Sequence, residues 1–234
     1  MADDDDLAAA RRSARRIALV AGAVGLVAVL VWVVVFSSVL GANRVVVHGA
    51  HTVSAAQIRS TAEVPHGHPL VRLDTGAIAR RVETLPGIAD VRVGVSYPST
   101  VVITVTERVA VGYLAVGGGS TKAILIDKSG RQFRTVGTAP AALPKFDIPS
   151  GPNATPIGQA VATAAGALTP ALLGKLSSIA ASSPAAITLH LRDGRTVLWG
   201  SADRSADKAQ VLPALLGRAG TTFDVSNPDV VVAR

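Results

Sequence analysis

An apolar run from residue 17 to residue 40 constrains this chain more than any other feature. The run, IALVAGAVGLVAVLVWVVVFSSVL, contains no charged side chain, and the nearest charges are Arg16 before it and Arg44 after it. At about 1.5 Å per helical residue, a run of this length spans the roughly 30 Å hydrocarbon core of a bilayer with some tilt. The sequence therefore predicts a single membrane-spanning helix over residues 17–40.

Two other interpretations of the run are a cleaved signal peptide and a helix buried in a protein core. The apolar part of a signal peptide covers only about 7 to 15 residues before a cleavage site flanked by small residues. The run in this chain is longer and offers only a poor site near Val39 and Gly41. Its length therefore favours an anchor that is not cleaved.

Positive charge lies mainly on one side of the run. Arg11, Arg12, Arg15 and Arg16 come directly before it, whereas only Arg44 follows directly after it. Loops rich in Lys and Arg stay on the cytoplasmic side of a membrane. We therefore expect residues 1–16 to be a cytoplasmic tail and the rest of the chain to be exported, as in a single-pass type II membrane protein.

Charge and cysteine content limit the partners of the exported part. The chain has a formal net charge of +7, and the four arginines before the run cancel four aspartates, so all of this charge lies beyond residue 40. A basic exported part can attract anionic wall polymer or lipid headgroups, although scattered charges fit simple solubility equally well. Export disfavours nucleic acid as a partner. The chain contains no cysteine, which excludes disulfides, thiolate catalysis and Cys-ligated metals.

The residues that follow the run have the pattern of a small α+β module. The β-branched stretch at 44–49 predicts a strand. Ser54 and Asp74 have the spacing of N-caps for two helices, the first ending near residue 62. We expect four apolar residues of these helices to face the sheet: Ile58, Ile78, Val82 and Leu85.

Two alternating stretches complete the module. Residues 91–96 and 101–107 alternate between apolar and polar side chains, and the turn sequence Tyr-Pro-Ser-Thr at 97–100 separates them. Alternation on both sides of such a turn predicts an antiparallel hairpin. The predicted order is strand, helix, helix, strand, strand.

Residues 113–234 have the pattern of a strand-rich domain with accessory helices. Turn sequences at 127–130 and 192–195 each lie between two β-prone stretches, which predicts two further hairpins. The Ala- and Leu-rich residues 156–180 predict two short helices separated at Pro170. The proline-rich residues 143–156 predict a loop. Pro213 predicts a kink or an early end in a helix that follows Ser205.

Several sequence blocks occur in a recognisable order. V-V-V-H-G-A, L-P-G-I-A-D-V-R-V and Y-P-S-T-V-V-I-T-V-T-E-R, within residues 44–108, resemble a POTRA domain. L-I-D-K-S-G-R-Q-F, L-P-K-F, L-R-D-G-R-T-V-L-W-G, D-K-A-Q-V-L-P-A-L-L and F-D-V-S-N-P resemble successive blocks of the β domain of the bacterial division family FtsQ/DivIB. The resemblance implies an α+β chain with a cytoplasmic tail at 1–16, a transmembrane helix at 17–40, a POTRA domain of order β-α-α-β-β at 44–110 and a β domain at 111–234.

The same resemblance implies a function. The chain is expected to be a non-enzymatic scaffold in the bacterial cell membrane at the division septum, where it links and recruits membrane proteins of the divisome, including the septal wall-synthesis complex. The alternative is a membrane-anchored exported enzyme or a wall-binding module. A deep pocket lined by groups with shifted pKa values would favour the alternative, whereas shallow surfaces and an exposed sheet edge favour the scaffold.

The C-terminal segment is the candidate binding site. Residues 222–226 and 229–234 predict two strands around an Asn-Pro turn, and the last strand is expected at a sheet edge with open backbone groups. A simply solvated edge is the alternative. The resemblance implies that this edge takes up a segment of the coiled-coil division proteins FtsB and FtsL by strand addition, with side-chain specificity from residues such as Phe223, Val230 and Val232. The candidate binding residues are Phe223, Val225, Ser226, Asp229, Val230, Val231, Val232, Ala233 and Arg234.

No residue is assigned a catalytic or metal-binding role. His48 with His51, and His66 with His68, have no neighbouring carboxylates that would complete a metal site. Residues 117–122 are rich in glycine, but their Lys and Ser/Thr order is the reverse of a phosphate-binding loop and a strand is expected to follow them. We therefore expect no cofactor and no small-molecule substrate.

Overall fold

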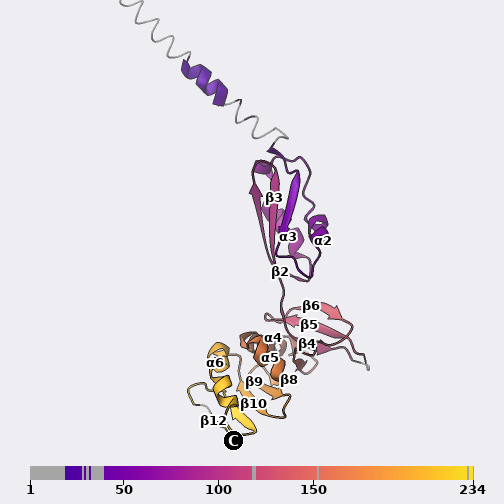
Figure 1. The fold of residues 1–234 in the computed structure, drawn as a ribbon, viewed down its shortest axis with the longest axis vertical. Coiled ribbons are helices and arrows are strands. Elements are labelled where there is room, and N and C mark those ends of the chain that lie inside the picture. Colours follow the sequence, from indigo (N-terminus) through magenta and orange to yellow (C-terminus); the bar gives the residue numbers. More distant parts are fainter. Residues whose placement is uncertain are drawn as a thin grey trace, which may run out of the picture. The chain divides into compact units, whose positions relative to one another are not determined.

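The computed structural model describes residues 19–27, 29, 32, 40–117, 120–151, 153–230 and 232–233. The chain divides into two compact units, unit 1 over Met1–Glu107 and unit 2 over Arg108–Arg234 (Figure 1). Residues 19–27 are helical, with exposed side chains. The predicted tail and most of the predicted anchor lie outside the described residues. Within the described residues, no helix combines the length and the apolar character needed to cross a bilayer.

Unit 1 has the predicted order of strand, helix, helix, strand, strand. A short 3-10 helix, η2, lies between the two α-helices. The elements are β1 (Arg44–His48), α2 (Ala55–Ala62), η2 (Leu70–Arg72), α3 (Thr75–Glu83), β2 (Ile88–Ser96) and β3 (Thr100–Glu107).

Both predicted N-caps of unit 1 are confirmed. The Ser54 side chain accepts a hydrogen bond of 3.1 Å from the backbone N–H of Gln57. The Asp74 carboxylate accepts one of 2.8 Å from the N–H of Ala77. These bonds satisfy N–H groups that the first turn of a helix leaves without an intrahelical partner.

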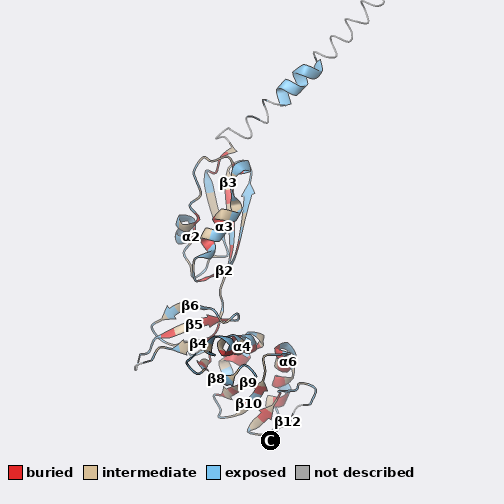
Figure 2. Ribbon diagram, turned by 180° about the vertical axis from the view of Figure 1, so that it is seen from behind, coloured by how far each residue is buried: buried red, intermediate tan, exposed pale blue. Residues whose placement is uncertain are grey.

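The three strands of unit 1 form a sheet in the order β1-β3-β2. β1 pairs with β3 in parallel, and β2 pairs with β3 as the predicted antiparallel hairpin. One face of the sheet is buried beneath α2 and α3 (Figure 2). Ile58, Ile78 and Val82 are at most 1% exposed, as predicted, and Leu85 is partly buried against them. The buried partners on β3 are Val101, Ile103 and Val105.

Unit 2 is a mixed nine-stranded sheet with three helices. The strand order is β12-β11-β10-β9-β8-β7-β4-β5-β6. The elements are β4 (Ala110–Ala115), β5 (Ala123–Asp127), β6 (Gln132–Val136), β7 (Lys145–Asp147), α4 (Ala154–Ala167), α5 (Pro170–Lys175), β8 (Leu176–Ser183), β9 (Ala186–Leu191), β10 (Thr196–Gly200), α6 (Ser205–Leu216), β11 (Thr222–Asp224) and β12 (Val232–Ala233). The predicted hairpins are β5–β6 and β9–β10, and both are antiparallel.

The structure corrects two boundaries in the middle of unit 2. Residues 176–180, predicted as helix, form the first part of β8, because Leu176 and Ile179 are buried while β8 pairs with both β7 and β9. Residues 145–147, predicted as loop, form β7, whose Phe146 is 2% exposed. Pairing on both sides outweighs the helix propensity of alanine in the first case and the neighbouring prolines in the second.

Pro213 does not end α6. The helix continues to Leu216, three residues beyond the proline. Leu212 and Leu215 are 1% and 3% exposed and pack into the core on either side of Pro213. Burial of the two leucines offsets the roughly 3 kcal/mol that a proline costs inside a helix.

The two C-terminal strands are shorter than predicted. β11 ends at Asp224 instead of residue 226, because the Asp224 carboxylate accepts hydrogen bonds from the N–H and hydroxyl of Ser226, which turns the chain. Among the described residues of the predicted strand at 229–234, Val232–Ala233 form β12, while 229 and 230 belong to the preceding turn. The turn after β11 reaches Val230, whose N–H donates to the Asn227 carbonyl.

Candidate partner-binding site

The last described strand lies at an edge of the nine-stranded sheet. β12 pairs with β11 in antiparallel register, with Phe223 opposite Ala233 and Asp224 opposite Val232. Among the described strands, none pairs with the other side of β12. The backbone groups on that side are therefore available to a further strand.

The side chains at this edge include two exposed valines. Val230 is 66% exposed and Val232 is 40% exposed. The register aligns Val232 with Asp224, and Asp224 in turn with Leu198 of β10. These three residues therefore share one face of the sheet, and Leu198 is also 40% exposed. The face beside the edge is partly apolar and open to solvent.

Two of the predicted binding residues belong to the core. Phe223 and Val225 are fully buried, so their side chains are not on the surface that a partner would touch. The guanidinium of Arg195 lies 5.7 Å from the centre of the Phe223 ring and donates a hydrogen bond of 2.7 Å to the Leu216 carbonyl. Phe223 and Val225 therefore hold β11 and the residue after it in the core of unit 2 and do not offer side chains to a partner. Val231 and Arg234 lie outside the described residues, and Ser226 is exposed.

Backbone contacts hold the segment between β11 and β12 against the sheet. The N–H of Val225 donates to the Leu198 carbonyl at 3.0 Å. Gly200, with φ of 73°, lies so close to Ser226 that an added Cβ would be 2.9 Å from the Ser226 Cβ. A glycine is required there by both its left-handed backbone and the lack of space.

Asp229, which precedes β12 in the sequence, forms a salt bridge with Arg204. The guanidinium of Arg204 donates to both carboxylate oxygens of Asp229, at 2.6 and 3.0 Å, and to Asp207 at 2.9 Å. The hydrogen bond from Arg204, together with its charge, lowers the pKa of Asp229. Arg204 has a left-handed backbone, with φ of 51°. No local sequence motif marks Arg204 as the partner of Asp229, because 25 residues separate the two.

A buried lysine joins α6 to the end of β10. Lys208 is 1% exposed, and its Nζ donates to the carbonyls of Trp199 at 3.0 Å and Ser201 at 2.8 Å. The Trp199 indole N–H donates to Ser205 at 3.2 Å. Burial lowers the pKa of Lys208. This arrangement is structural, because the amine and the indole already have partners within the core.

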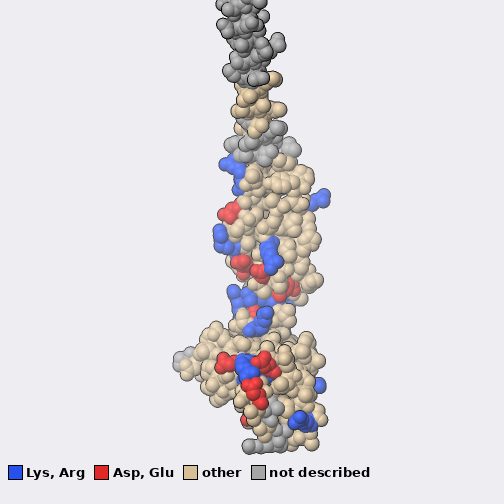
Figure 3. Space-filling model, turned by 90° about the vertical axis from the view of Figure 1, so that its left-hand side faces the viewer, with Lys and Arg blue, Asp and Glu red and all other residues tan. Residues whose placement is uncertain are grey.

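The groups of unit 2 with a shifted pKa do not line its hollows. A hollow of about 810 Å³ between β5, β7 and α4 is lined by residues such as Ile124, Phe146 and Gln159. Among the described residues, the groups with a clearly shifted pKa do not line it; they are Glu107, Asp127, Asp193, Arg204, Lys208 and Asp229. On the face drawn in Figure 3, both units carry basic and acidic side chains, and most of those on unit 2 gather in one cluster of both signs.

Two family models match the chain. The model described as POTRA domain, FtsQ-type, matches residues 40–108. The model described as Cell division protein FtsQ/DivIB, C-terminal, matches residues 115–230. The first match covers β1 to β3 with α2, η2 and α3, and the second covers most of unit 2.

Three similar proteins are each named Cell division protein FtsQ. Cell division protein FtsQ of Mycolicibacterium smegmatis is 41% identical over 196 residues, which cover 83% of this chain and 57% of the relative. FtsQ of Mycobacterium tuberculosis is 39% identical over 195 residues, which cover 83% of this chain and 61% of the relative. FtsQ of Streptomyces venezuelae is 35% identical over 225 residues, which cover 92% of this chain and 82% of the relative. The chain thus spans about three fifths of the length of the mycobacterial relatives.

Solved structures also match the chain. One of them is the major extracytoplasmic domain of the bacterial cell division protein DivIB from Geobacillus stearothermophilus, with 21% sequence identity and a TM-score of 0.37. The match covers 47% of this chain and 91% of that chain.

Proposed function

This chain belongs to the FtsQ/DivIB family of cell division proteins, and from that premise we propose that it is a non-enzymatic scaffold of the divisome. It is anchored in the cell membrane by one helix at residues 17–40, with its N-terminus in the cytoplasm. Its exported units link and recruit other membrane proteins at the division septum.

The observation that carries this proposal is the β12 edge. Proteins usually protect an exposed strand edge with charge, proline or a covering element, because open backbone groups pair readily with other chains. Here the edge carries Val230 and Val232, and the Arg204–Asp229 salt bridge holds the preceding residue in place. An ordered apolar edge suits a partner that adds a strand, since backbone hydrogen bonds supply affinity and alternate side chains supply specificity.

We assign the added strand to a segment of the small coiled-coil division proteins FtsB and FtsL. Val230 and Val232 provide the exposed side-chain contacts, while Phe223 and Val225 act from the core by fixing the position of β11. The exposed residues Ser226 and Asp229 lie on the turn that leads into β12.

The alternative, an anchored exported enzyme, has less support. An active site normally combines a pocket with titratable groups whose pKa values are shifted for the chemistry. In the described part of this chain, the 810 Å³ hollow and the shifted groups lie in different places. Each shifted group also has a partner that accounts for a structural role, such as Asp127 with Arg108 and Ser129.

Binding of the full chain to an FtsB/FtsL complex in detergent or nanodiscs tests the proposal. Val232→Asp places a charge at the edge, and we expect it to weaken binding at least tenfold. Leu198→Asp is the matched control, because Leu198 has the same exposure on the same face but lies on β10, two strands from the edge. We expect it to bind normally. Deletion of residues 229–234 should abolish binding.

Equal loss of binding in both aspartate variants would assign the contact to the face of the sheet and reject the edge. Undiminished binding after the deletion would reject the C-terminal site altogether. Circular dichroism and hydrogen exchange of the β8–β10 core confirm that each variant is folded.

A further inference from the structure

One end of unit 1 is built from three segments that lie far apart in the sequence. Residue 41 bridges to Pro69, and the N–H of Ala42 donates to the His68 carbonyl at 2.8 Å. The N–H of Asn43 donates to the Ser99 carbonyl at 2.9 Å. The residues before β1 are therefore tied both to the loop around η2 and to the β2–β3 turn. We call this the entry end, made of residues 40–44, 65–73 and 95–100.

The exposed apolar side chains of unit 1 gather at the entry end. Among the described residues from 40 to 107, the exposed large apolar side chains are Val71, Val95 and Tyr97, at 51%, 36% and 58%. All three belong to the entry end, although the sheet itself extends to Glu107 at its other end. Tyrosine at a boundary between apolar and aqueous phases buries its ring and keeps its hydroxyl in water.

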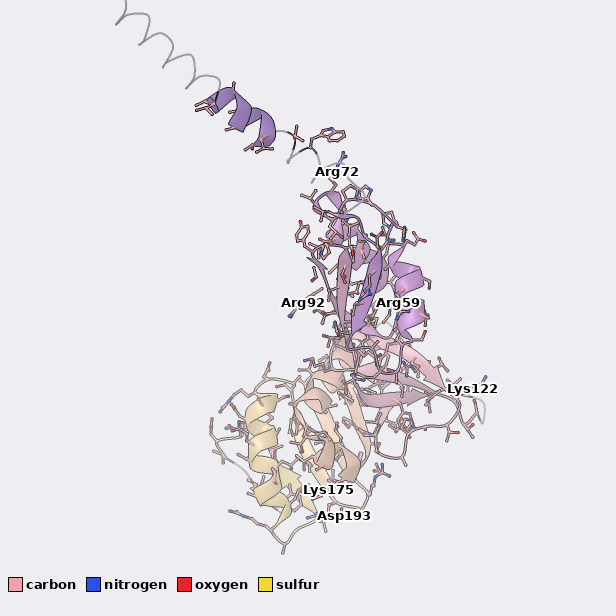
Figure 4. The ribbon with its side chains drawn as sticks, turned by 45° about the horizontal axis from the view of Figure 1, so that its top comes forward. Arg59, Arg72, Arg92, Lys122, Lys175 and Asp193 are labelled. Atoms are coloured by element: carbon pink, nitrogen blue, oxygen red, sulfur yellow. The ribbon has the colours of Figure 1, made fainter. Side chains whose placement is uncertain are left out.

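The entry end is also basic. It contains Arg44 and Arg72, both exposed, and its three segments contain no Asp or Glu. The nearest acidic residues in the sequence, Glu63 and Asp74, flank the second segment; Glu63 lies 3.9 Å from the guanidinium of Arg81, and Asp74 uses its carboxylate as the N-cap of α3. Figure 4 shows Arg72 at this end of unit 1, whereas Arg59 and Arg92 lie farther along the unit. Basic and aromatic side chains together are typical of protein surfaces that lie at a membrane interface.

Chain connectivity brings this end close to a bilayer. β1 begins at Arg44, only four residues after Leu40, where the proposed anchor ends. At no more than about 3.6 Å per residue, Arg44 lies within roughly 14 Å of the end of the anchor. The headgroup layer on one side of a bilayer is itself roughly 5 to 7 Å thick. Since hydrogen bonds fix residues 41–43 to the entry end, that end cannot swing away without breaking them.

We propose that the entry end is a membrane-contact surface that rests on the outer leaflet of the bilayer. Tyr97 and Val71 insert their apolar parts at the level of the headgroups, and Arg44 and Arg72 bind the phosphates of anionic phospholipids. The contact orients unit 1 on the membrane, with Glu107 at the end of the sheet away from it. This inference rests on the anchor in the proposed function, but it adds a surface that binds lipid outside the spanning helix.

Depth-dependent fluorescence quenching of the full chain in vesicles tests the proposal. The chain has no native cysteine, so each single-cysteine variant carries one environment-sensitive fluorophore. Val71→Cys and Tyr97→Cys report on the entry end, and both side chains are exposed. His48→Cys is the matched control, an exposed site at the far end of β1. Leu26→Cys reports on the anchor.

The quenchers are lipids that carry a spin label in the headgroup or deep in the acyl chain. We expect headgroup quenching at positions 71 and 97 several times stronger than at 48, and acyl-chain quenching at 26. We also expect the quenching at 97 to increase when phosphatidylglycerol is added to phosphatidylcholine. Arg44→Glu with Arg72→Glu should remove that increase, because each arginine near an anionic surface shifts the contact equilibrium about fivefold.

The outcomes separate this inference from the anchor. Quenching at 71 and 97 no stronger than at 48, with strong acyl-chain quenching at 26, would overturn the membrane contact and leave the anchor in place. Absence of quenching at 26 would overturn the anchor itself. Quenching at 71 and 97 that does not respond to phosphatidylglycerol would overturn the role of the two arginines.

Discussion

Glu107 has more hydrogen-bond partners than its place at the end of a strand requires. Its carboxylate accepts from the backbone N–H groups of His51, Thr52 and Val53, at 2.8 to 3.0 Å, and from the Thr52 hydroxyl. Burial raises the pKa of Glu107, but these hydrogen bonds favour the charged form more strongly and lower the pKa to about 2. The side chain thereby ties the end of β3 to the segment between β1 and α2.

The lowered pKa of Glu107 predicts a pH dependence of the stability of unit 1. A folded pKa of about 2, against an ordinary value of 4.5, means that the stabilisation is complete above pH 4.5 and is lost as the pH falls toward 2. Glu107→Gln should reduce the free energy of unfolding of unit 1 by about 1 to 3 kcal/mol at pH 7 and remove this acid dependence. Hydrogen exchange of the buried β3 amides at pH 7 and pH 3 measures both effects.

Glu83→Gln is the control for Glu107. It neutralises an exposed carboxylate at the end of α3, and we expect a change within about 0.5 kcal/mol. If both variants change the stability of unit 1 equally, net charge and not the hydrogen bonds of Glu107 is responsible.

Some residues of the candidate site have roles that can be predicted from the sequence, and others do not. Val230 and Val232 belong to a β-prone segment, so an exposed apolar edge could be expected from their pattern. The burial of Phe223 and the salt bridge of Arg204 could not, because both depend on contacts with residues far away in the sequence. The same is true of Lys208, whose carbonyl partners lie seven and nine residues away on β10 and the loop after it.

At the scale of the element, capped and periodic segments were the predictable ones. The helices that begin after Ser54 and Asp74 follow from N-cap spacing and from an apolar face with helical period. The start of β8 was predicted as helix because it continues the Ala- and Leu-rich stretch that begins at residue 156. Pairing with β7 and β9 determines its structure instead. The local sequence pattern is thus sufficient to predict a helix that has its own capping residues. It is insufficient for a segment whose structure is determined by pairing with neighbouring strands.

The buried face of α3 predicts a large loss of stability when it is shortened. Ile78 is 1% exposed within the core of unit 1. Ile78→Ala should lower the free energy of unfolding of unit 1 by about 2 to 4 kcal/mol, through lost burial and the cavity that remains. Arg80→Ala is the control, because Arg80 is exposed, lies two residues later on α3 and is also replaced by alanine. It should change the free energy of unfolding by less than about 0.5 kcal/mol. Hydrogen exchange of the β3 amides in both variants makes the comparison; a loss below 0.5 kcal/mol for Ile78→Ala would be incompatible with this packing.

The segment that leads into β12 should depend on the Arg204–Asp229 salt bridge. Arg204→Gly removes the guanidinium while suiting the left-handed backbone at that position. We expect faster amide exchange in residues 229–233 and unchanged exchange in the β8–β10 core. Asp207→Asn, which removes the other carboxylate partner but leaves Asp229 paired, should leave the segment as slow as in the parent chain. Faster exchange in both variants would point to the loop before α6 as a whole.

At the scale of the whole molecule, unit 1 has a direction. Its chain enters β1 at Arg44, beside Thr100, and leaves β3 at Glu107, at the far end of the same sheet. An odd number of strands with β1 parallel to β3 produces this arrangement, since entry and exit must then fall at opposite ends. Unit 1 therefore has Arg44 and Glu107 at opposite ends of its sheet.

The arginine asymmetry around residues 17–40 predicts the topology of the chain. Four arginines precede the run and one follows it closely, which predicts that residues 1–16 lie in the cytoplasm and that the residues beyond Asn43 lie outside. Ser13→Cys and Ala185→Cys test each side, because the parent chain has no cysteine and Ala185 is exposed in the β8–β9 turn. A membrane-impermeant maleimide should label Ala185→Cys in intact spheroplasts and Ser13→Cys only after the membrane is permeabilised. The reverse pattern would place the β12 edge in the cytoplasm, and labelling of both sites before permeabilisation would show that the run does not cross the membrane.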